Sequence, residues 1–409
     1  MISMNKLNNK EQFTISENHY YIGIEGMASK FSVGVLSDNR GNILSATRSS
    51  PISLHTIPND VLFISVNDLI RKLIKKANLE KTILSNTNVC IGLTGTTFSY
   101  DREIDLQENI FGAIRPKLKN IICTGDAEIA FLSCAQTGAG SIVTCLLGST
   151  VLIVGNKNNN LTFTRFGGWG PIFGDEGSSF HMGREVFKAI SNSYDYKEPL
   201  SILWKEVDEW LSKPEPYFEA WEKGSLCWKE AKHEFQKSSS GNLDPRTLLF
   251  YFAHHFNNSI GFEYNPEGFE LWRNITGGLV IPLMKAYEKD ETAKRIVHLA
   301  VDSLVEQHYG AFVTSKQETF EPVVLFGGVF NHNPKFVELF KDRLQKKYDK
   351  KIIFITRFSK ETMRPACGAL LLALSNSKTQ ELKLPGSDFI HTVYENQKNT
   401  LYSEILKNN

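Results

Sequence analysis

Glycines and carboxylates concentrate in one short stretch of this sequence that is suited to ligand binding. Residues Gly167 to Ser178 read GGWGPIFGDEGS, with five glycines, one tryptophan and the adjacent acids Asp175 and Glu176. Glycine lets the backbone approach a ligand closely, and carboxylates accept hydrogen bonds from hydroxyl groups. This composition favours a loop around a polyhydroxyl ligand, with Trp169 as an apolar wall and Gly168 beside it.

Asp126 is the candidate for a general base. The run Thr124-Gly125-Asp126 lies between an apolar stretch at 120–124, which predicts a strand, and one at 127–135, which predicts a helix. A carboxylate at that place can accept a proton from a hydroxyl nucleophile. The same position also suits a helix N-cap, for which Asp is a common residue, and the turn alone favours the cap.

Two glycine-bearing turns are candidates for phosphate binding. The first runs from Gly23 to Lys30 after a predicted strand, and its small residues allow backbone N–H groups to approach phosphate. Glu25 in this turn can hold a metal ion through water. Either turn alone is equally typical of an ordinary hairpin. The second turn is Leu147–Thr150, between two predicted strands. The candidate phosphate-binding residues are Gly26, Ser29 and Lys30 in the first turn, and Gly148 and Ser149 in the second.

The pattern of apolar runs predicts an α/β fold. Residues 20–44 alternate and turn as two strands, a polar turn and a third strand. Apolar side chains at i, i+3 and i+4 spacing predict a helix over 64–79, and further strands are expected at 89–93 and 120–124. From Gly140 onward the order of strand, polar loop, strand, turn and strand begins again, which indicates a weak internal duplication.

This repeated pattern predicts two α/β domains. A later buried strand is expected over 323–330, and a final apolar helix near 367–375. The expected segments are a flexible extension (1–18), a first domain (19–137), a second domain (138–375) with a helical, Trp-rich insertion near 196–240, and a tail (376–409) that returns to the first domain.

Three features outside these turns favour structural roles. The tryptophans between Trp204 and Trp228 are expected to anchor helix packing, although a partner-binding surface is the alternative. Adjacent residues of a helix face different directions, so His254 and His255 are not expected to share a metal. The basic segment 341–351 is interrupted by aspartates, which favours a solvated helix face.

Composition argues against several kinds of partner. Lys and Arg number 46 and Asp and Glu 45, so the net charge of +1 gives no bulk attraction to nucleic acid or to an anionic membrane. No apolar run reaches the length that a membrane helix needs. The six cysteines form no C-x-x-C pair, which predicts reduced thiols in a cytoplasmic protein and argues against an iron–sulfur cluster.

Over residues 21–375 the sequence resembles the N-acetylglucosamine kinases within the group of BadF/BadG/BcrA/BcrD ATPases. The resemblance implies two duplicated actin-like (ribonuclease H-like) domains with an interdomain cleft. It also implies an ATP-dependent kinase of an amino sugar or related hexose, and a homodimer. The motifs that carry the resemblance are Gly23–Ser29, Thr124–Ala127, Gly167–Ser178, Phe326–Phe330 and Pro365–Ala369.

The resemblance also assigns roles to individual residues. Asp126 would be the general base for the sugar hydroxyl, and ATP with Mg²⁺ would be the phosphoryl donor. Glu25 and Ser29 would face the phosphates and Mg²⁺, with Glu25 acting on the metal through water. Gly327 and Gly328 would pack against adenosine. The residues implied along the sugar pocket are Gly168, Trp169, Asp175 and Glu176.

Both phosphate loops depart from the family pattern. The first usually reads Gly-Gly-Gly-Thr after its acidic residue, and here Met27 and Ala28 add side-chain bulk. The second usually carries a Thr where this chain has Leu147. A catalytically impaired protein of the same fold, which binds sugar or nucleotide and acts in regulation, is therefore the alternative to an active kinase.

Overall fold

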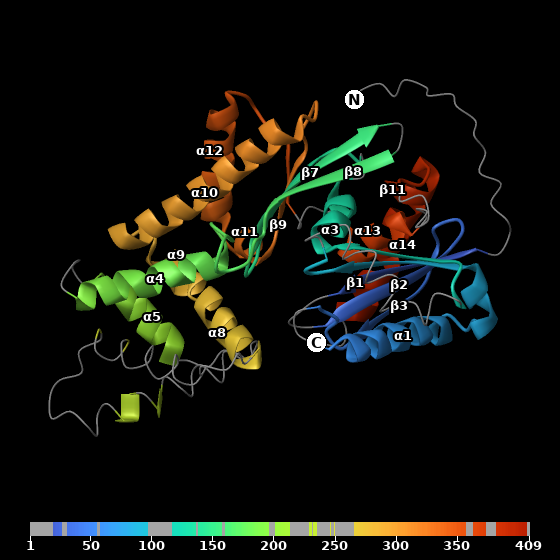
Figure 1. Cartoon of the computed structure of the whole chain (residues 1–409), viewed down its shortest axis with the longest axis horizontal. Coiled ribbons are helices and arrows are strands. Elements are labelled where there is room, and N and C mark those ends of the chain that lie inside the picture. Colours follow the sequence, from blue (N-terminus) through green and yellow to red (C-terminus); the bar gives the residue numbers. More distant parts are fainter. Residues whose placement is uncertain are drawn as a thin grey trace. The chain divides into compact units, whose positions relative to one another are not determined.

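The computed structural model describes residues 19–26, 31–54, 58–96, 117–135, 138–157, 160–195, 201–212, 229–230, 232–234, 246, 249, 266–356, 363–373 and 382–406. The chain forms two compact units (Figure 1). Unit 1 comprises Met1–Asp126 and Pro365–Asn409, and unit 2 comprises Ala127–Arg364. These limits differ from the sequence-based domain boundaries at 137 and 375, because the chain enters unit 2 at the start of a helix and leaves it before another.

Unit 1 is built on a sheet of strand order β3-β2-β1-β4-β5. The hairpins β1–β2 and β2–β3 are antiparallel, whereas β4 and β5 run parallel to β1. The polar turn before β3 forms because the Asp38 carboxylate accepts hydrogen bonds from the backbone N–H groups of Arg40 and Asn42, both at 2.9 Å. The strands are β1 (Tyr20–Gly26), β2 (Ser32–Asp38), β3 (Ile43–Ser49), β4 (Thr87–Leu93) and β5 (Asn120–Gly125).

Helices cover both faces of this sheet. A Cβ on Gly34 would meet Leu69 and Leu73 of α1, whereas a Cβ on Gly23 would meet the backbone of α13 at Ala366. Because Gly34 is paired with Ile24, the neighbour of Gly23, these two glycines face opposite sides of the pleat. The other elements of unit 1 are α1 (Asn59–Lys76), the 3₁₀ helix η1 (Lys81–Asn86), α13 (Pro365–Leu372), β11 (Leu382–Lys383) and α14 (Ser387–Leu406).

Unit 2 repeats the mixed sheet, with strand order β10-β9-β6-β7-β8. β6–β7 and β7–β8 are antiparallel, and β9 is parallel to β6. The predicted strand over 323–330 is wrong beyond Phe326, because Gly327 takes a φ of +119° and the chain turns into a helix. The strands are β6 (Gly140–Cys145), β7 (Ser149–Lys157), β8 (Asn160–Gly167), β9 (Val323–Phe326) and β10 (Phe354–Thr356).

The helices of unit 2 bury a large apolar core against its sheet. Trp204 is buried in this core, and the Trp210 ring lies against Gly278, so these two tryptophans anchor packing as predicted. Trp221, Trp228, His254 and His255 lie outside the described residues. The helices are α3 (Asp126–Cys134), α4 (Ser179–Tyr194), α5 (Leu203–Ser212), α8 (Pro266–Gly278), α9 (Val280–Ala286), α10 (Glu291–Ser315), α11 (Gly328–His332) and α12 (Pro334–Tyr348).

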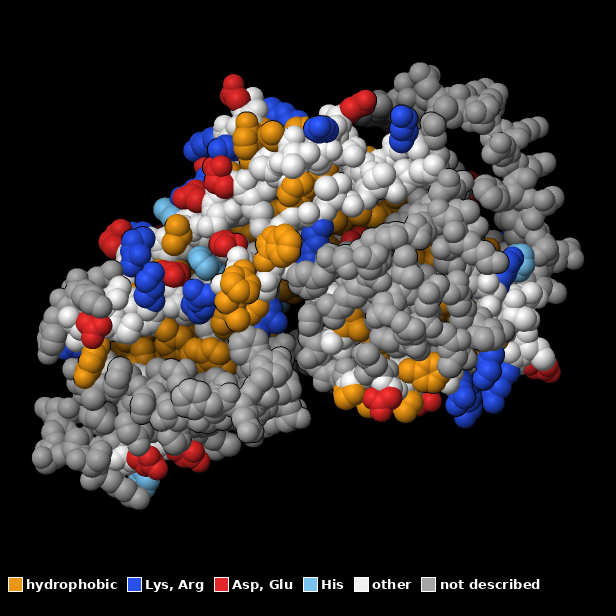
Figure 2. All heavy atoms as spheres, viewed as in Figure 1, with side chains coloured by type: hydrophobic (Ala, Val, Ile, Leu, Met, Phe, Trp, Pro, Cys, Tyr) orange, Lys and Arg blue, Asp and Glu red, His pale blue; other side chains and the backbone are white. Residues whose placement is uncertain are grey.

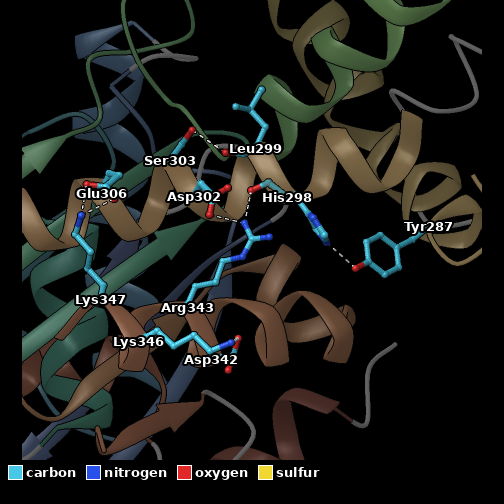
Figure 3. Close-up of polar contacts among 10 residues, drawn as sticks. All are labelled: Tyr287, His298, Leu299, Asp302, Ser303, Glu306, Asp342, Arg343, Lys346 and Lys347. Atoms are coloured by element: carbon cyan, nitrogen blue, oxygen red, sulfur yellow. Dashed lines mark hydrogen bonds and ion pairs between the residues drawn. The ribbon is translucent and has the colours of Figure 1, made fainter. Parts of the chain in front are cut away.

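A polar seam joins α10 to α12 (Figure 3). Arg343 of α12 donates a hydrogen bond to the His298 carbonyl of α10 at 2.9 Å and forms an ion pair with Asp302. One turn further on, Lys347 pairs with Glu306 at 2.7 Å. Arg343, Lys346 and Lys347 of α12 are thus paired with acids at exposed or half-buried positions, in agreement with the predicted solvated helix face.

The prediction of reduced thiols is confirmed for the described part of the chain. Cys90, Cys123, Cys134, Cys145 and Cys367 are free and buried. Burial raises the pKa of the Cys145 thiol far above its ordinary value, so that this side chain behaves as an apolar group. Among the described residues, no helix combines the length and the apolar character needed to cross a membrane.

Candidate functional site

The candidate base and the first phosphate turn lie at the same edge of the unit 1 sheet. The three parallel strands β1, β4 and β5 are in register there, with Gly26 beside Leu93 and Leu93 beside Gly125. Carboxyl ends of parallel strands therefore meet at this edge, which is where α/β sheets place their ligand groups. Glu25 and Asp126 are brought to it from segments about a hundred residues apart in the sequence.

Asp126 is the first residue of α3 and is half-buried. Its Oδ2 accepts a hydrogen bond from the Thr94 hydroxyl at 2.9 Å, and Thr94 follows β4 as Asp126 follows β5. A hydrogen bond to a carboxylate is stronger than one between neutral groups and fixes the side-chain orientation. Sequence reasoning missed Thr94, although its place after a buried strand was the available signal.

Glu25 is 6% exposed in β1, and Gly26 ends that strand. A Cβ on Gly26 would lie 2.2 Å from the Leu93 side chain and 2.7 Å from the Ile52 carbonyl oxygen, so no larger residue fits. Ser29 and Lys30, the other predicted members of this turn, lie outside the described residues.

In unit 2, the second phosphate turn and the Gly167–Ser178 loop share one edge of the sheet. β6 ends at Cys145 and β7 begins at Ser149, while Gly167 at the end of β8 is paired with Thr150. Phe326 at the end of β9 is paired with Thr144 of β6. The topology therefore brings Gly148, Ser149, Gly168 and Gly327 together from three separate turns.

Asp175 is buried beneath the second phosphate turn. Its Oδ1 accepts a hydrogen bond from the Ser149 N–H at 3.4 Å, and its Oδ2 lies 3.6 Å from a guanidinium nitrogen of Arg273 on α8. A Cβ on Gly148 would approach the same carboxylate to 2.9 Å, which explains the glycine. Burial raises the pKa of Asp175, against the opposing effects of Arg273, the Ser149 N–H and Arg165. Nothing in the sequence pattern pointed to Arg273.

The turn and the loop are tied together at further points. The Ser149 hydroxyl donates to the Glu176 carbonyl at 2.7 Å, and the Ser179 N–H donates to the Leu146 carbonyl at 2.9 Å. The Glu176 side chain itself is exposed. The N–H and the hydroxyl of Ser149 are thus both bonded to the loop, so a movement of the turn affects the loop.

The start of the Gly167–Ser178 loop depends on close backbone packing. Gly168 is buried at a φ of +67°, and a Cβ there would lie 2.1 Å from the Thr150 hydroxyl and 2.2 Å from Arg165. Arg165 donates to the Thr150 hydroxyl at 3.3 Å and to the Gly168 carbonyl at 3.2 Å. Trp169, the next residue, is 66% exposed, so its ring is available for an apolar contact with a ligand.

The glycine pair after β9 combines one tight position with one open position. A Cβ on Gly327 would lie 2.3 Å from the Cys145 carbonyl oxygen, which requires glycine there. A Cβ on Gly328 would meet no atom within 4 Å. The backbone at the start of α11 is therefore accessible beside the second phosphate turn, and a flat ligand group can rest on it.

Proteins with sequences similar to this chain include sugar kinases. An N-acetyl-D-glucosamine kinase of Dictyostelium discoideum is 23% identical over 371 residues, which cover 88% of this chain and 98% of that relative. An N-acetylmuramic acid/N-acetylglucosamine kinase of Clostridium acetobutylicum is 29% identical over 194 residues, or 47% of this chain and 60% of that relative.

Solved structures confirm the predicted actin-like α/β fold. A protein of Chromobacterium violaceum, provisionally named an N-acetylglucosamine kinase, matches with a TM-score of 0.55 at 16% identity, over 88% of this chain and all of that one. A similarly named protein of Porphyromonas gingivalis matches with a TM-score of 0.52 at 13% identity, over 86% and 97% of the two chains.

The family model of the BadF/BadG/BcrA/BcrD ATPases matches residues 22–373. That span includes both sheet edges described above, all of unit 2 and about two thirds of the residues of unit 1. The chain belongs to the BadF/BadG/BcrA/BcrD ATPase family.

Proposed function

We propose that this protein is an ATP-dependent sugar kinase that transfers the γ-phosphoryl group to a hydroxyl of N-acetylglucosamine or of a related amino sugar or hexose. The observation that carries the proposal is the Asp126 carboxylate, held by the Thr94 hydroxyl at the ligand edge of unit 1. The kinase names of the two relatives support the same reaction class. A single oriented base suffices because phosphoryl transfer depends mainly on positioning and charge stabilisation.

Asp126 receives the proton of the attacking sugar hydroxyl in this proposal. The Thr94 hydroxyl keeps the carboxylate turned toward the reacting atom, and Trp169 offers the sugar an apolar face. Gly168 and Glu176, which belong to the same loop as Trp169, are also proposed to contact the sugar. Asp175 is proposed to contact the sugar through Oδ2, in place of its ion pair with Arg273, while Oδ1 keeps its bond to the Ser149 N–H.

The residues of unit 2 fit a nucleotide. Adenosine rests on Gly327 and Gly328, where the second position has open space above its Cα, and the phosphates face Gly148 and Ser149. Mg²⁺, which neutralises phosphate charge in such reactions, would be held by phosphate oxygens and by Glu25 through water. Within the described residues, no three His, Cys, Asp or Glu side chains group as metal ligands, and this arrangement needs none.

The test is product detection by mass spectrometry. The pure protein is incubated with Mg-ATP and a panel of sugars led by N-acetylglucosamine and N-acetylmuramic acid, with Asp126→Asn in parallel. Asp342→Asn is the matched control, because Asp342 is an exposed acid that pairs with Lys346 on α12, away from both sheet edges. A sugar phosphate formed by the wild type and the control, but not by Asp126→Asn, is expected. Equal product from all three would contradict the assignment of the base.

A regulatory protein that binds sugar or nucleotide without turnover is the second candidate. Two observations favour it. The N–H and the hydroxyl of Ser149 are both hydrogen-bonded to the Gly167–Ser178 loop and are therefore not open to a phosphate, and Leu147 lies close to Gly277. Calorimetry separates the two candidates. Binding of sugar without binding of Mg-ATP, together with no product from any sugar, would support the regulatory protein. A cytoplasmic location and a homodimer stay predictions.

A further inference from the structure

A cavity of about 420 Å³ lies in unit 1 between α1, η1 and the segment before β5. Its α1 wall is formed by residues at helical spacing, which include Asn67 and Arg71. η1 contributes Lys81 and two hydroxyl residues, Thr82 and Ser85, and Lys117 completes the lining. Cations and hydroxyl groups from three separate segments therefore surround one space.

The lining residues that the structure describes carry charges of one sign. Arg71, Lys81 and Lys117 contribute three positive charges, and no carboxylate is among the described lining residues. None of the three forms an ion pair within the part of the chain that the structure describes. Lys and Arg side chains gather at the lower right of Figure 2, near the right-hand end of α1 in Figure 1. A pocket lined by one sign of charge raises the local concentration of ligands of the opposite sign.

The floor of the cavity is apolar. It is lined by Phe63, Ile70 and Ile74 of α1 and by Leu84 of η1. Ile70 and Ile74 are buried, and Phe63 is half-buried. Its volume falls within the range of roughly 300 to 1,000 Å³ typical of small-molecule sites. An inorganic ion would leave this floor uncovered, whereas an organic anion would use both the cations and the apolar surface.

The cavity lies at the edge of the sheet opposite to Asp126. η1 leads directly into the amino end of β4, and Lys117 precedes the amino end of β5, whereas Asp126 follows the carboxyl end of β5. β5 has 6 residues, and a strand rises about 3.3 Å per residue, so roughly 20 Å separate the two edges. A ligand here would not compete directly for the groups around Asp126.

We propose that this cavity is a binding site for a small organic phosphate, distinct from the proposed kinase site. The Arg71 guanidinium offers a planar fork of donors to the phosphate, and Lys81 and Lys117 supply point charges to a dianion. The Thr82 hydroxyl donates to a remaining oxygen, Ser85 keeps its own hydrogen bond to the Thr82 carbonyl, and the organic part of the ligand covers Leu84 and Phe63. The site requires no kinase reaction, so it stands or falls separately from the proposed function.

Calorimetry on the full chain tests the site with three probes: AMP, N-acetylglucosamine 6-phosphate and inorganic phosphate. Arg71→Gln/Lys81→Gln removes two lining charges. Lys72→Gln/Lys75→Gln removes two charges from exposed positions of the same helix that do not line the cavity. Because both variants change the net charge equally, only loss of the specific contacts distinguishes them. Melting curves verify that each variant remains folded.

One of the two organic phosphates is expected to bind at least about tenfold more weakly to Arg71→Gln/Lys81→Gln, and nearly unchanged to the control variant. Its affinity should fall with ionic strength, and turnover of sugar should be the same in both variants. Binding that neither variant weakens, or that both weaken equally, would overturn the proposal. So would the absence of binding by any probe at millimolar concentration. Equal affinity for inorganic phosphate would overturn the organic part of the ligand class.

Discussion

Gly327→Ala and Gly328→Ala form a pair of adjacent substitutions with opposite expected outcomes. At Gly327 the new methyl group would lie 2.3 Å from the Cys145 carbonyl oxygen and 3.0 Å from Leu146, at a φ of +119°. Backbone strain of this kind costs about 1 to 3 kcal/mol, and overpacking against a fixed backbone atom costs about the same again. At Gly328 the methyl group meets nothing within 4 Å and lies in a helix, where Ala is better than Gly by up to about 1 kcal/mol.

A loss of roughly 3 kcal/mol corresponds to a fall in Tm of about 6 to 12 °C for units of this size. Thermal unfolding and urea titration of both variants measure it, with Gly328→Ala as the matched control. Calorimetry with Mg-ATP then adds the functional readout: nucleotide binding should weaken in Gly327→Ala, because the strand end that carries the turn is displaced. A Gly327→Ala protein within about 1 °C of the wild type, or one no less stable than Gly328→Ala, would refute the reasoning.

Three further substitutions test other parts of the account. Thr94→Val removes the 2.9 Å hydrogen bond to the half-buried Asp126, so kcat should fall about 5- to 10-fold with little change in KM. Thr87→Val is the control: Thr87 lies at the far end of β4, and this substitution should leave kcat unchanged. Burial raises the pKa of Asp175, so its ionisation opposes folding. The Tm of Asp175→Asn relative to the wild type should therefore rise as the pH increases from about 4 to 7, because only the wild type then carries the buried charge. Burial lowers the pKa of His308 to about 3, so stability should be complete above about pH 6.5 and fall between there and pH 3, a dependence that His308→Gln should reduce in urea titrations.

The strands and their edges were predictable because their signals are local. Apolar runs and polar turns marked β1 to β5, and Glu25 and Asp126 were each expected beside the end of one of these strands. The register of β1, β4 and β5 then shows that these strand ends share one edge. Composition also correctly predicted buried thiols and a solvated face on α12.

The contacts that orient the site were not predictable, because they join residues far apart in the sequence. Thr94 and Asp126 meet only through the register of β4 and β5. Arg273 of α8 contacts Asp175 although it lies about a hundred residues later in the sequence. The prediction of a strand over 323–330 was wrong beyond Phe326 for a different reason. Its apolar run continues through Phe330, but close approach of Gly327 to β6 forces a turn that hydropathy does not encode.

The most direct test of the central claim is a paired measurement on Asp126→Asn: the rate of sugar phosphate formation and the Kd for the same sugar. If Asp126 is the base that accepts the hydroxyl proton, the rate should fall by at least about a hundredfold, while the Kd changes only a few-fold. A rate close to that of the wild type would contradict the assignment of the base. A rate and an affinity lost together would show that Asp126 binds the sugar without activating it.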